Sequence, residues 1–272
     1  MPEIPEIETV CTHLRDSVLN SPITGITINR AKCLNIASES FISLVSGQSI
    51  SAVGRRAKII LLTLSNHHTI TIHFMLEGYV QLLKSDDPDL SHASVALCLS
   101  TDKTLAFFKI NLGYIHLFPT TDWRTIDDVS NIGPEPLSED FTASHFLALL
   151  RTRKGMIKPL LMDQKLIAGI GNVYSNEVLF CSRILPTRKV KEMTDEELSH
   201  IYHCLRSILN QAIYRGGVYD RKYSRSDTLT GGYVPYLKVA YRTDGPCYEC
   251  GLPIQTQRVG GRNAFYCSNC QH

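Results

Sequence analysis

Residues 247–270 read CYECGLPIQTQRVGGRNAFYCSNC, and this stretch decides the architecture of the C-terminal part of the chain. Each end carries a Cys-x-x-Cys pair, Cys247 with Cys250 and Cys267 with Cys270, and sixteen residues separate the two pairs. This spacing is typical of a structural zinc site, in which two knuckles supply four thiolates to one tetrahedral ion. Disulfides are the alternative, but the acidic start MPEIPEIE lacks the basic segment of a secretory signal peptide. We therefore predict one structural zinc ion with no open coordination position.

The residues between the knuckles predict a β-hairpin. Residues 254–259 and 263–267 have strand-like composition, and Gly260-Gly261-Arg262 supplies the turn. Arg262 then lies at the tip of a metal-braced finger. Its guanidinium group matches phosphate oxygens in a bidentate way. A solvated turn residue is the plainer interpretation of the same position.

Upstream of the finger, the pattern predicts helices. Residues 141–150 and 156–167 are amphipathic, and 173–181 follow the sharp break Ala168-Gly-Ile-Gly171. Thr194-Asp-Glu-Glu197 is a capping box that opens a further helix, which ends at Gly216-Gly217. The polar residues 218–232 that follow predict a mobile loop.

The N-terminal half has a different texture. Residues 3–19 predict a helix, and five short β-branched or apolar runs predict strands. The runs span 23–28, 57–64, 69–74, 94–99 and 114–118. Short strands without long intervening helices indicate an antiparallel β-sandwich. Asn131-Ile-Gly-Pro-Glu-Pro136 is a boundary, so the whole chain reads as a multidomain α+β protein.

Charge is distributed unevenly along the 272 residues. Residues 1–150 carry 10 Lys/Arg against 16 Asp/Glu, whereas residues 151–272 carry 18 against 10. This asymmetry indicates a polyanionic partner held by the C-terminal half, with compositional scatter as the alternative. We find no apolar run long enough for a membrane span, and we expect a cytoplasmic protein. The five remaining cysteines, Cys11, Cys33, Cys98, Cys181 and Cys204, are expected to behave as small hydrophobic residues.

The N-terminal residues offer a specific chemical reactivity. Removal of Met1 leaves Pro2 with a free secondary amine, and a terminal amine has a pKa well below that of a lysine side chain. Such an amine can attack C1′ of a sugar and form an iminium, while Glu3 protonates the ring oxygen or the leaving base. Taken alone, Pro2 is also compatible with a simple lead-in to a helix.

Together these features resemble the formamidopyrimidine-DNA glycosylase/endonuclease VIII family over essentially the whole chain. The matching motifs are MPEIPEIET at the N-terminus, Arg55-Arg-Ala-Lys58, Gly133-Pro-Glu-Pro-Leu137, Lys158, Asp163-Gln164, Gly169-Ile-Gly-Asn172-Val-Tyr174 through Glu177, and Arg262. The resemblance implies a catalytic β-sandwich domain at 1–130, a linker at 131–140 and a zinc finger at 234–272. It also implies a DNA-binding helical domain at 141–233, with a helix–two-turn–helix element and the loop 218–232.

The same resemblance implies a base-excision-repair enzyme that acts on damaged DNA as a monomer, without a nucleotide cofactor or a membrane. Pro2 displaces the damaged base, Glu3 acts as the acid, and β,δ-elimination nicks the strand at the resulting abasic site. Lys58 contributes to catalysis, and with it His73, Asn172 and Arg262 grip the flanking phosphates. Lys158 is expected to bind DNA as well.

The resemblance fails at the side chains that fill the space left by the flipped base. Leu76, Ile110 and Leu112 stand where relatives that excise 8-oxoguanine carry Met, Arg and Phe. Leucine still serves as an apolar wedge, but Ile110 cannot hydrogen-bond the orphaned base. We therefore expect a main substrate other than 8-oxoguanine opposite C. Loop 218–232 matches the family's lesion-capping loop in length but not in sequence.

Two alternatives to the enzyme stay open at this point. One is a protein on the same scaffold that binds damaged or abasic DNA without cutting it. The other is a structural zinc protein without a DNA role. Retention of Pro2, Glu3 and Lys58 favours the enzyme over the first, and the charge asymmetry favours it over the second.

Overall fold

The computed structural model describes residues 1–125 and 127–272, which divide into two compact units. Unit 1 comprises Met1–Ser130 and Arg215–Gly232, and unit 2 comprises Asn131–Tyr214 and Tyr233–His272. The first part of unit 1 ends at the residue where the N-terminal domain was expected to end. Segment Arg215–Gly232 differs from expectation: it belongs to the N-terminal unit, whereas 218–232 had been assigned to the helical domain.

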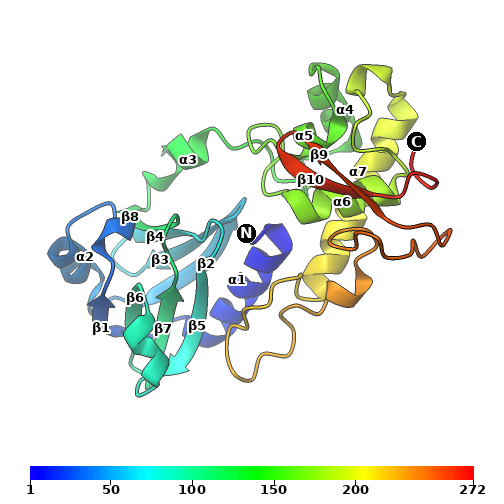
Figure 1. The fold of residues 1–272 in the computed structure, drawn as a ribbon. Helices are drawn as coiled ribbons and strands as arrows, with labels where there is room; N and C mark the ends of the chain where they lie inside the picture. Colours follow the sequence, from blue (N-terminus) through cyan, green and yellow to red (C-terminus); the bar gives the residue numbers. More distant parts are fainter. Residues whose placement is uncertain (126) are drawn as a thin grey trace. The chain divides into compact units, whose positions relative to one another are not determined.

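Unit 1 is built from two four-stranded antiparallel sheets (Figure 1). The helices of this unit are α1 (Ile4–Val18), α2 (Ser38–Val45) and α3 (Asp127–Ser130). Its strands are β1 (Ile23–Ile28), β2 (Ile50–Arg56), β3 (Ile59–Leu64), β4 (His68–His73), β5 (Tyr79–Lys84), β6 (Val95–Leu99), β7 (Lys103–Phe108) and β8 (Tyr114–Pro119). The sheet orders are β1-β6-β7-β5 and β2-β3-β4-β8, and one apolar core includes residues of both sheets and of α1. The predicted sandwich is confirmed, although β2, β5 and β7 were not anticipated.

Helix α1 is held along β2. Its apolar stripe, which includes Ile7 and Leu14, is buried in the core, and each such side chain contributes roughly 1.5–3 kcal/mol. Polar contacts fix its position along the strand: Arg15 Nε donates to the Val53 carbonyl at 3.2 Å, and Cys11 Sγ lies 3.4 Å from the Gly54 carbonyl. The middle and the second half of α1 are therefore anchored to the sheet.

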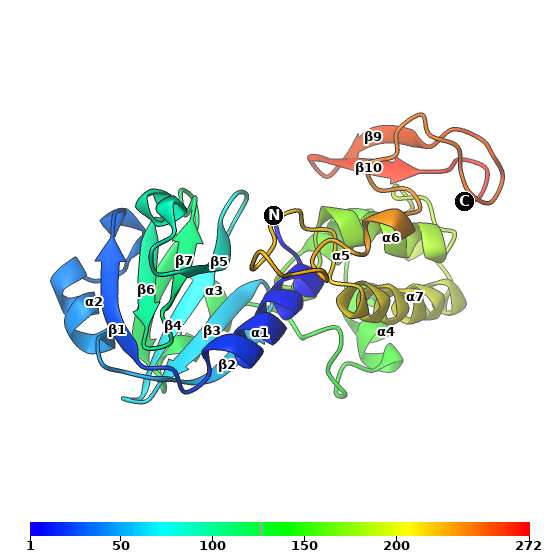
Figure 2. The ribbon, with the colours of Figure 1, turned by 90° about the horizontal axis from the view of Figure 1, so that it is seen from below.

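Unit 2 combines four helices with a hairpin (Figure 2). The elements are α4 (Ala143–Arg151), α5 (Ile157–Met162), α6 (Asn172–Cys181), α7 (Asp195–Tyr214), β9 (Gln255–Val259) and β10 (Arg262–Tyr266). The capping box before α7 is confirmed: Thr194 N–H donates to Glu197 Oε2 at 2.8 Å, and Glu197 N–H donates to Thr194 Oγ1 at 3.2 Å. The helix predicted over 156–167 ends at Met162, because Asp163 accepts the Lys165 amide at 2.9 Å and closes a turn.

One disulfide links α6 to α7. It joins Cys181 and Cys204, whose Cα atoms lie 5.9 Å apart, so the expectation that both are free hydrophobic cysteines is wrong. Nothing in the spacing of the cysteines predicts this pairing, because the two residues come from separate helices and meet only when α6 packs on α7. Within the described residues, no helix combines the length and the apolar character needed to cross a membrane.

Candidate functional site

The N-terminal residues are placed by the first turn of α1. Glu3 is the N-cap: its side chain accepts from the backbone of Glu6, and its own N–H donates to Glu6 Oε2 at 2.8 Å. Glu3 and Glu6 are each 3% exposed, and Pro2 is also buried, whereas Met1 is 47% exposed. The helix thus holds Glu3 in one place and leaves Met1 accessible from solvent.

Lys58 lies in the turn between β2 and β3, and this turn is tied to helix α1. Glu8 on α1 accepts from Arg55 Nε at 3.0 Å, and Arg55 Nη1 donates to the Ala57 carbonyl at 3.1 Å. Burial disfavours the charged form of Glu8, but the hydrogen bonds from Arg55 and Arg15 prevail and hold its pKa below the ordinary value. Helix α1 therefore carries Glu3 and also fixes the turn that presents Lys58.

His73 lies beside this turn because of strand register. It ends β4 opposite Ile59, the residue that follows Lys58, and its ring stacks on Tyr114 with centroids 5.7 Å apart. Lys58 is 6% exposed. The structure thus brings Lys58 and His73, two of the predicted phosphate-binding residues, to the same end of one sheet, where β3 begins and β4 ends.

Two loops next to His73 carry the void-filling positions. Gly113 lies so close to His73 that a Cβ atom on it would be 2.2 Å from the His73 carbonyl oxygen, and a Cβ on Gly78 would be 3.0 Å from Ile110 Cδ1. The loops that bear Leu76 and Leu112 are therefore neighbours, and these leucines are 53% and 67% exposed.

Ile110 does not fit the role predicted for it. Its side chain is fully buried in the core of unit 1, and its backbone is held by Ser94 Oγ and Arg30 Nε at 3.2 and 3.0 Å. A side chain in this position cannot enter the space left by a flipped base. The exposed residues of this loop are Lys109, Asn111 and Leu112.

In unit 2, Lys158 differs from expectation in a similar way. The residue is fully buried, and its Nζ donates to Asn172 Oδ1 at 2.8 Å and to Ser175 Oγ at 2.9 Å. A buried ammonium group needs such partners, because its desolvation is costly. The predicted direct contact with DNA is therefore not supported for Lys158, whose charge instead orients Asn172 at the start of α6.

The turn before α6 is held by one side chain. Gln164 accepts from the Gly169 N–H at 2.9 Å and donates to the Ile170 carbonyl at 2.7 Å. Gly169 has φ +76°, a left-handed conformation in which glycine is favoured. Asn172 is the first residue of the helix, where amide groups and the helix dipole favour an anion.

The finger packs on the same helical region. Asn176 on α6 accepts from the Phe265 amide at 3.2 Å, and the turn glycine Gly260 lies against Pro159 of α5. Arg262 follows this turn and is exposed. The structure thus brings Asn172 and the Arg262 hairpin to one group of elements in unit 2, while Pro2, Glu3, Lys58 and His73 belong to unit 1.

Glu177 is a buried carboxylate whose importance the sequence did not reveal beyond the motif match. It is 1% exposed and accepts from the amides of Lys238, Val239 and Ala240 at 2.8 to 3.0 Å. Burial raises its pKa, although the three amides oppose this effect. The Glu177 side chain thus connects α6 to the segment that leads into the finger.

The four cysteines of the finger form one cluster. Their sulfur atoms all lie within 4.8 Å of one another, with Cys247–Cys270 at 3.9 Å and Cys250–Cys267 at 3.5 Å. A tetrahedral zinc–thiolate site requires sulfur–sulfur distances of about 3.8 Å. The cluster fits one structural zinc ion.

Three protein-family models match the chain. They are the formamidopyrimidine-DNA glycosylase N-terminal domain at residues 1–110, the formamidopyrimidine-DNA glycosylase H2TH domain at 132–223, and the zinc finger found in FPG and IleRS at 245–272. The last match agrees with the cysteine geometry, and the finger is a zinc finger with one structural zinc site.

Whole-length relatives agree with these matches. The chain is 35% identical to the formamidopyrimidine-DNA glycosylase of Pelotomaculum thermopropionicum and 36% identical to that of Chloroflexus aggregans, covering 100% of this chain and 99% and 98% of the relatives. Two crystal structures of Lactococcus lactis Fpg align with a TM-score of 0.92 at 29% identity over 99% of both chains. One is a complex with DNA containing N7-benzyl-Fapy-dG, and the other is a complex with DNA containing an abasic site.

Proposed function

The chain belongs to the formamidopyrimidine-DNA glycosylase family and is a DNA glycosylase with abasic-site lyase activity, and from this premise we propose which residues carry the reaction. Pro2, freed of Met1, is the nucleophile. Its nitrogen attacks C1′ of the damaged nucleotide and the C1′–base bond breaks. Glu3 supplies the proton to the ring oxygen or the departing base. The resulting iminium permits β- and δ-elimination of the flanking phosphates.

The observation that carries this proposal is the capping of α1 by Glu3. The hydrogen bonds with Glu6 hold the carboxylate of Glu3 immediately beside the residue that becomes the terminal amine. A fixed acid next to a nucleophile lowers the entropic cost of the reaction. This arrangement supports the enzyme over a protein that only binds DNA.

Recognition of the DNA is assigned to both units. The Lactococcus lactis structures contain lesion-bearing or abasic DNA, and we propose damaged DNA as the partner here. Lys58 and His73 in unit 1 and Asn172 and Arg262 in unit 2 contact the phosphates around the lesion. Their positions support this proposal. Lys58 and His73 lie at the same end of one sheet, Asn172 begins α6, and Arg262 lies at the tip of the finger. We further propose that the enzyme acts as a monomer in the cytoplasm, on the chromosomal DNA it repairs.

The loops that carry the void-filling positions indicate how the substrate range of this enzyme differs from that of relatives that excise 8-oxoguanine. Leu76 and Leu112 are exposed on neighbouring loops and are suited to insert between bases. Neither offers a hydrogen bond to the orphaned base, so we propose weak discrimination between opposite bases and a main substrate other than 8-oxoguanine opposite C. A cleavage panel of defined lesions in duplex, bubble and single-stranded DNA tests this point.

Borohydride trapping on abasic-site DNA tests the chemistry. Processed protein should give a covalent adduct, and Pro2→Gly protein or protein that retains Met1 should give none. Glu3→Gln should slow base excision far more than cleavage of a preformed abasic site, because no base has to leave in the second case. An adduct of undiminished yield from protein that retains Met1 would contradict the assignment of Pro2.

A further inference from the structure

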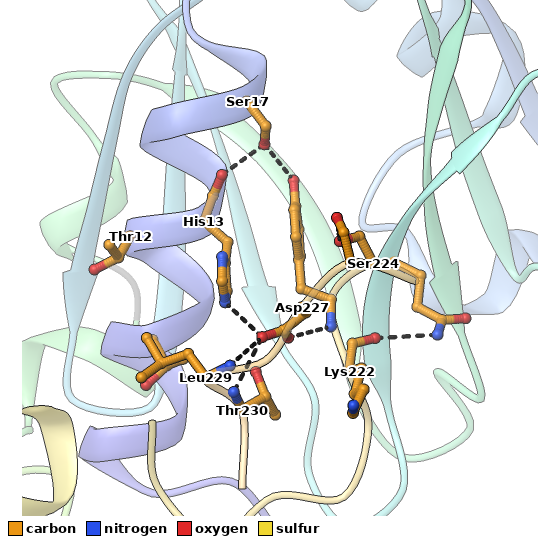
Figure 3. A network of polar contacts seen from close by, with 12 residues as sticks. Thr12, His13, Ser17, Lys222, Ser224, Asp227, Leu229 and Thr230 are labelled. Carbon is orange, nitrogen blue, oxygen red and sulfur yellow. Dashed lines mark hydrogen bonds and ion pairs between the residues drawn. The ribbon is translucent and has the colours of Figure 1, made fainter. Parts of the chain in front are cut away.

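Segment Arg215–Gly232 has no regular helix or strand among its described residues, yet two of its polar side chains are buried. Tyr223 is 3% exposed and Asp227 is 4% exposed. A polar group is buried in a loop only when partners replace its water, because an unpaired one is costly. These partners lie on α1, on β5 and in the segment itself, and Figure 3 shows most of them. Such contacts argue against the mobility predicted for residues 218–232.

Asp227 is the centre of this network. Its Oδ2 accepts from the Tyr223 N–H at 2.9 Å, and its Oδ1 accepts from the N–H groups of Leu229 and Thr230 at 2.9 and 3.0 Å. His13 of α1 places Nε2 at 3.3 Å from Oδ1 (Figure 3). Burial works against the charge on Asp227, but the hydrogen bonds of Thr230 and Tyr223 and the neighbouring His13 hold its pKa below the ordinary value. One carboxylate thus accepts three backbone hydrogen bonds within the segment and lies in polar contact with His13 of α1.

Tyr223 attaches the segment a second time. Its ring stacks on His13 with centroids 5.2 Å apart and an interplanar angle of 3°, and its hydroxyl lies 2.7 Å from Ser17 Oγ. Because the single Ser17 proton is donated to the His13 carbonyl, the Tyr223 hydroxyl is the donor in this pair. The Tyr223 carbonyl accepts from the Leu82 amide of β5 at 2.8 Å.

The beginning of the segment is connected to the N-terminus through Glu6. Val218 N–H donates to Glu6 Oε1 at 2.9 Å, while the other oxygen of the same carboxylate accepts from Glu3 N–H. Gly217 has φ +66°, and a Cβ on it would be 2.3 Å from Glu6 Oε1. The carboxylate of Glu6 thus contacts both the backbone of Glu3 and the beginning of the segment.

Asp227 and Glu6 are joined by a short chain of contacts. Leu229, whose N–H is bound by Asp227, presents its carbonyl to Gly216, where an added Cβ would lie only 2.1 Å from that oxygen. Gly216 precedes Gly217, which abuts Glu6. These contacts form a continuous path from Asp227 through Leu229, Gly216-Gly217 and Glu6 to the backbone of Glu3.

We propose that Asp227 and His13 are positioning residues that lock segment Arg215–Gly232 onto α1 and thereby fix the N-terminal nucleophile and acid. The inference rests on the proposed roles of Pro2 and Glu3. The segment is then an ordered part of unit 1 before DNA binds. Neither anchor touches the reacting atoms, and both act through Glu6.

The experiment compares Asp227→Asn and His13→Gln with Asp220→Asn in the full, zinc-loaded and processed protein. Asp227→Asn turns an amide N–H₂ toward one of the backbone donors, and His13→Gln removes the ring that stacks on Tyr223. Asp220 is exposed on the same segment and makes no contact with α1 in the described network, so its variant is the matched control. Circular dichroism at the assay temperature selects folded protein, and His13→Gln serves if Asp227→Asn does not fold.

Three readouts are needed. Trypsin cleavage after the exposed residues Arg221, Lys222 and Arg225 reports release of the segment. Amide hydrogen exchange at residues 3–7 reports release of the N-terminus. Single-turnover adduct formation on abasic-site DNA, measured with the half-saturating DNA concentration, reports positioning separately from binding.

We expect cleavage of the segment to accelerate about tenfold and exchange at residues 3–7 to rise in both anchor variants, with adduct formation about tenfold slower. The half-saturating DNA concentration should stay within about twofold of wild type, because no phosphate contact is lost. Asp220→Asn should match wild type throughout.

Wild-type cleavage rates in both anchor variants would overturn the lock. Faster cleavage with unchanged exchange at residues 3–7 and unchanged adduct formation would overturn the positioning role. If wild-type protein itself forms no adduct, the proposed function of Pro2 fails, and the exchange at residues 3–7 still decides whether the segment fixes the N-terminus.

Discussion

Lys158 Nζ lies 2.8 Å from Asn172 Oδ1, so a lysine that the sequence suggested as a DNA contact is instead a buried support for the first residue of α6. The same ammonium group also donates to Ser175. The start of α6 is thus organised from within unit 2 before any ligand arrives.

This relationship makes a prediction about salt dependence. Lys158→Met keeps the approximate length of the side chain but removes the ammonium group that donates to Asn172 Oδ1 and Ser175 Oγ. We expect about tenfold weaker binding to abasic-site DNA, because Asn172 loses its orientation. The slope of log affinity against log salt should not change, since the phosphate contact of Asn172 carries no charge and no cationic contact is lost. Lys154→Met, which removes an exposed charge nearby, is the control. A slope reduced by about one unit in Lys158→Met would show that Lys158 itself contacts phosphate.

In the loop at 109–113, we expect truncation of the two apolar residues Ile110 and Leu112 to have different effects, one on stability and the other on excision. Ile110→Ala should lower the free energy of unfolding by about 3 kcal/mol, because a fully buried side chain leaves a cavity. Leu112→Ala, at a position 67% exposed, should change stability by less than about 0.5 kcal/mol and should slow excision from duplex DNA. Urea unfolding and single-turnover excision measure the two effects. Equal losses of stability would contradict the inward orientation of Ile110.

Glu8 predicts a specific pH dependence of stability. Its pKa is lowered in the folded state, so its contribution is fully present above the unfolded pKa and disappears as the pH falls through the folded value. Glu8→Gln should therefore be less stable than wild type at neutral pH, and the difference should shrink in acid. Asp16→Asn, on the exposed face of the same helix, is the control. Urea unfolding from pH 7 to pH 3 gives the two curves, and a constant difference would count against the Arg55–Glu8–Arg15 cluster as its cause.

Removal of zinc should disable DNA binding without unfolding unit 1. Metal analysis should find one zinc ion per chain, and chelation should release it and expose the small core in which Phe180 of α6 packs against Ile254 and Phe265 of the finger. Affinity for abasic-site DNA should then fall by more than about tenfold, as Arg262 loses its fixed position. Cys270→Ser should behave like the chelated protein, whereas Cys98→Ser, outside the cluster, should keep its zinc. Full affinity after loss of the metal would refute a role for the finger in binding.

Features that depend on neighbours in the sequence were predictable. The two Cys-x-x-Cys pairs determine the zinc site because each knuckle is a local turn, and Thr194 with Glu197 determines where α7 begins because both hydrogen bonds span one helical turn. Pro2 and Glu3 were identified because their chemistry depends on being at the chain terminus. Their environment, including the bridge from Glu6 to Val218, was not predicted.

The tertiary structure decided which side chains are buried and which distant segments meet. Ile110 lies in a loop where its neighbours Lys109 and Asn111 are exposed, and only the packing of Gly78 and the core against it shows that it faces inward. Segment Arg215–Gly232 has the polar composition of a mobile loop, yet Asp227 meets His13 from a point more than 200 residues earlier in the chain. Sequence by itself determined the family and the metal site, and it suggested the residues proposed for the reaction, because these follow from local spacing and residue chemistry. Burial and long-range pairing depend on the free energy of the assembled fold, and they alone decided that Lys158 is a support, Ile110 a core residue and Arg215–Gly232 a fixed wall.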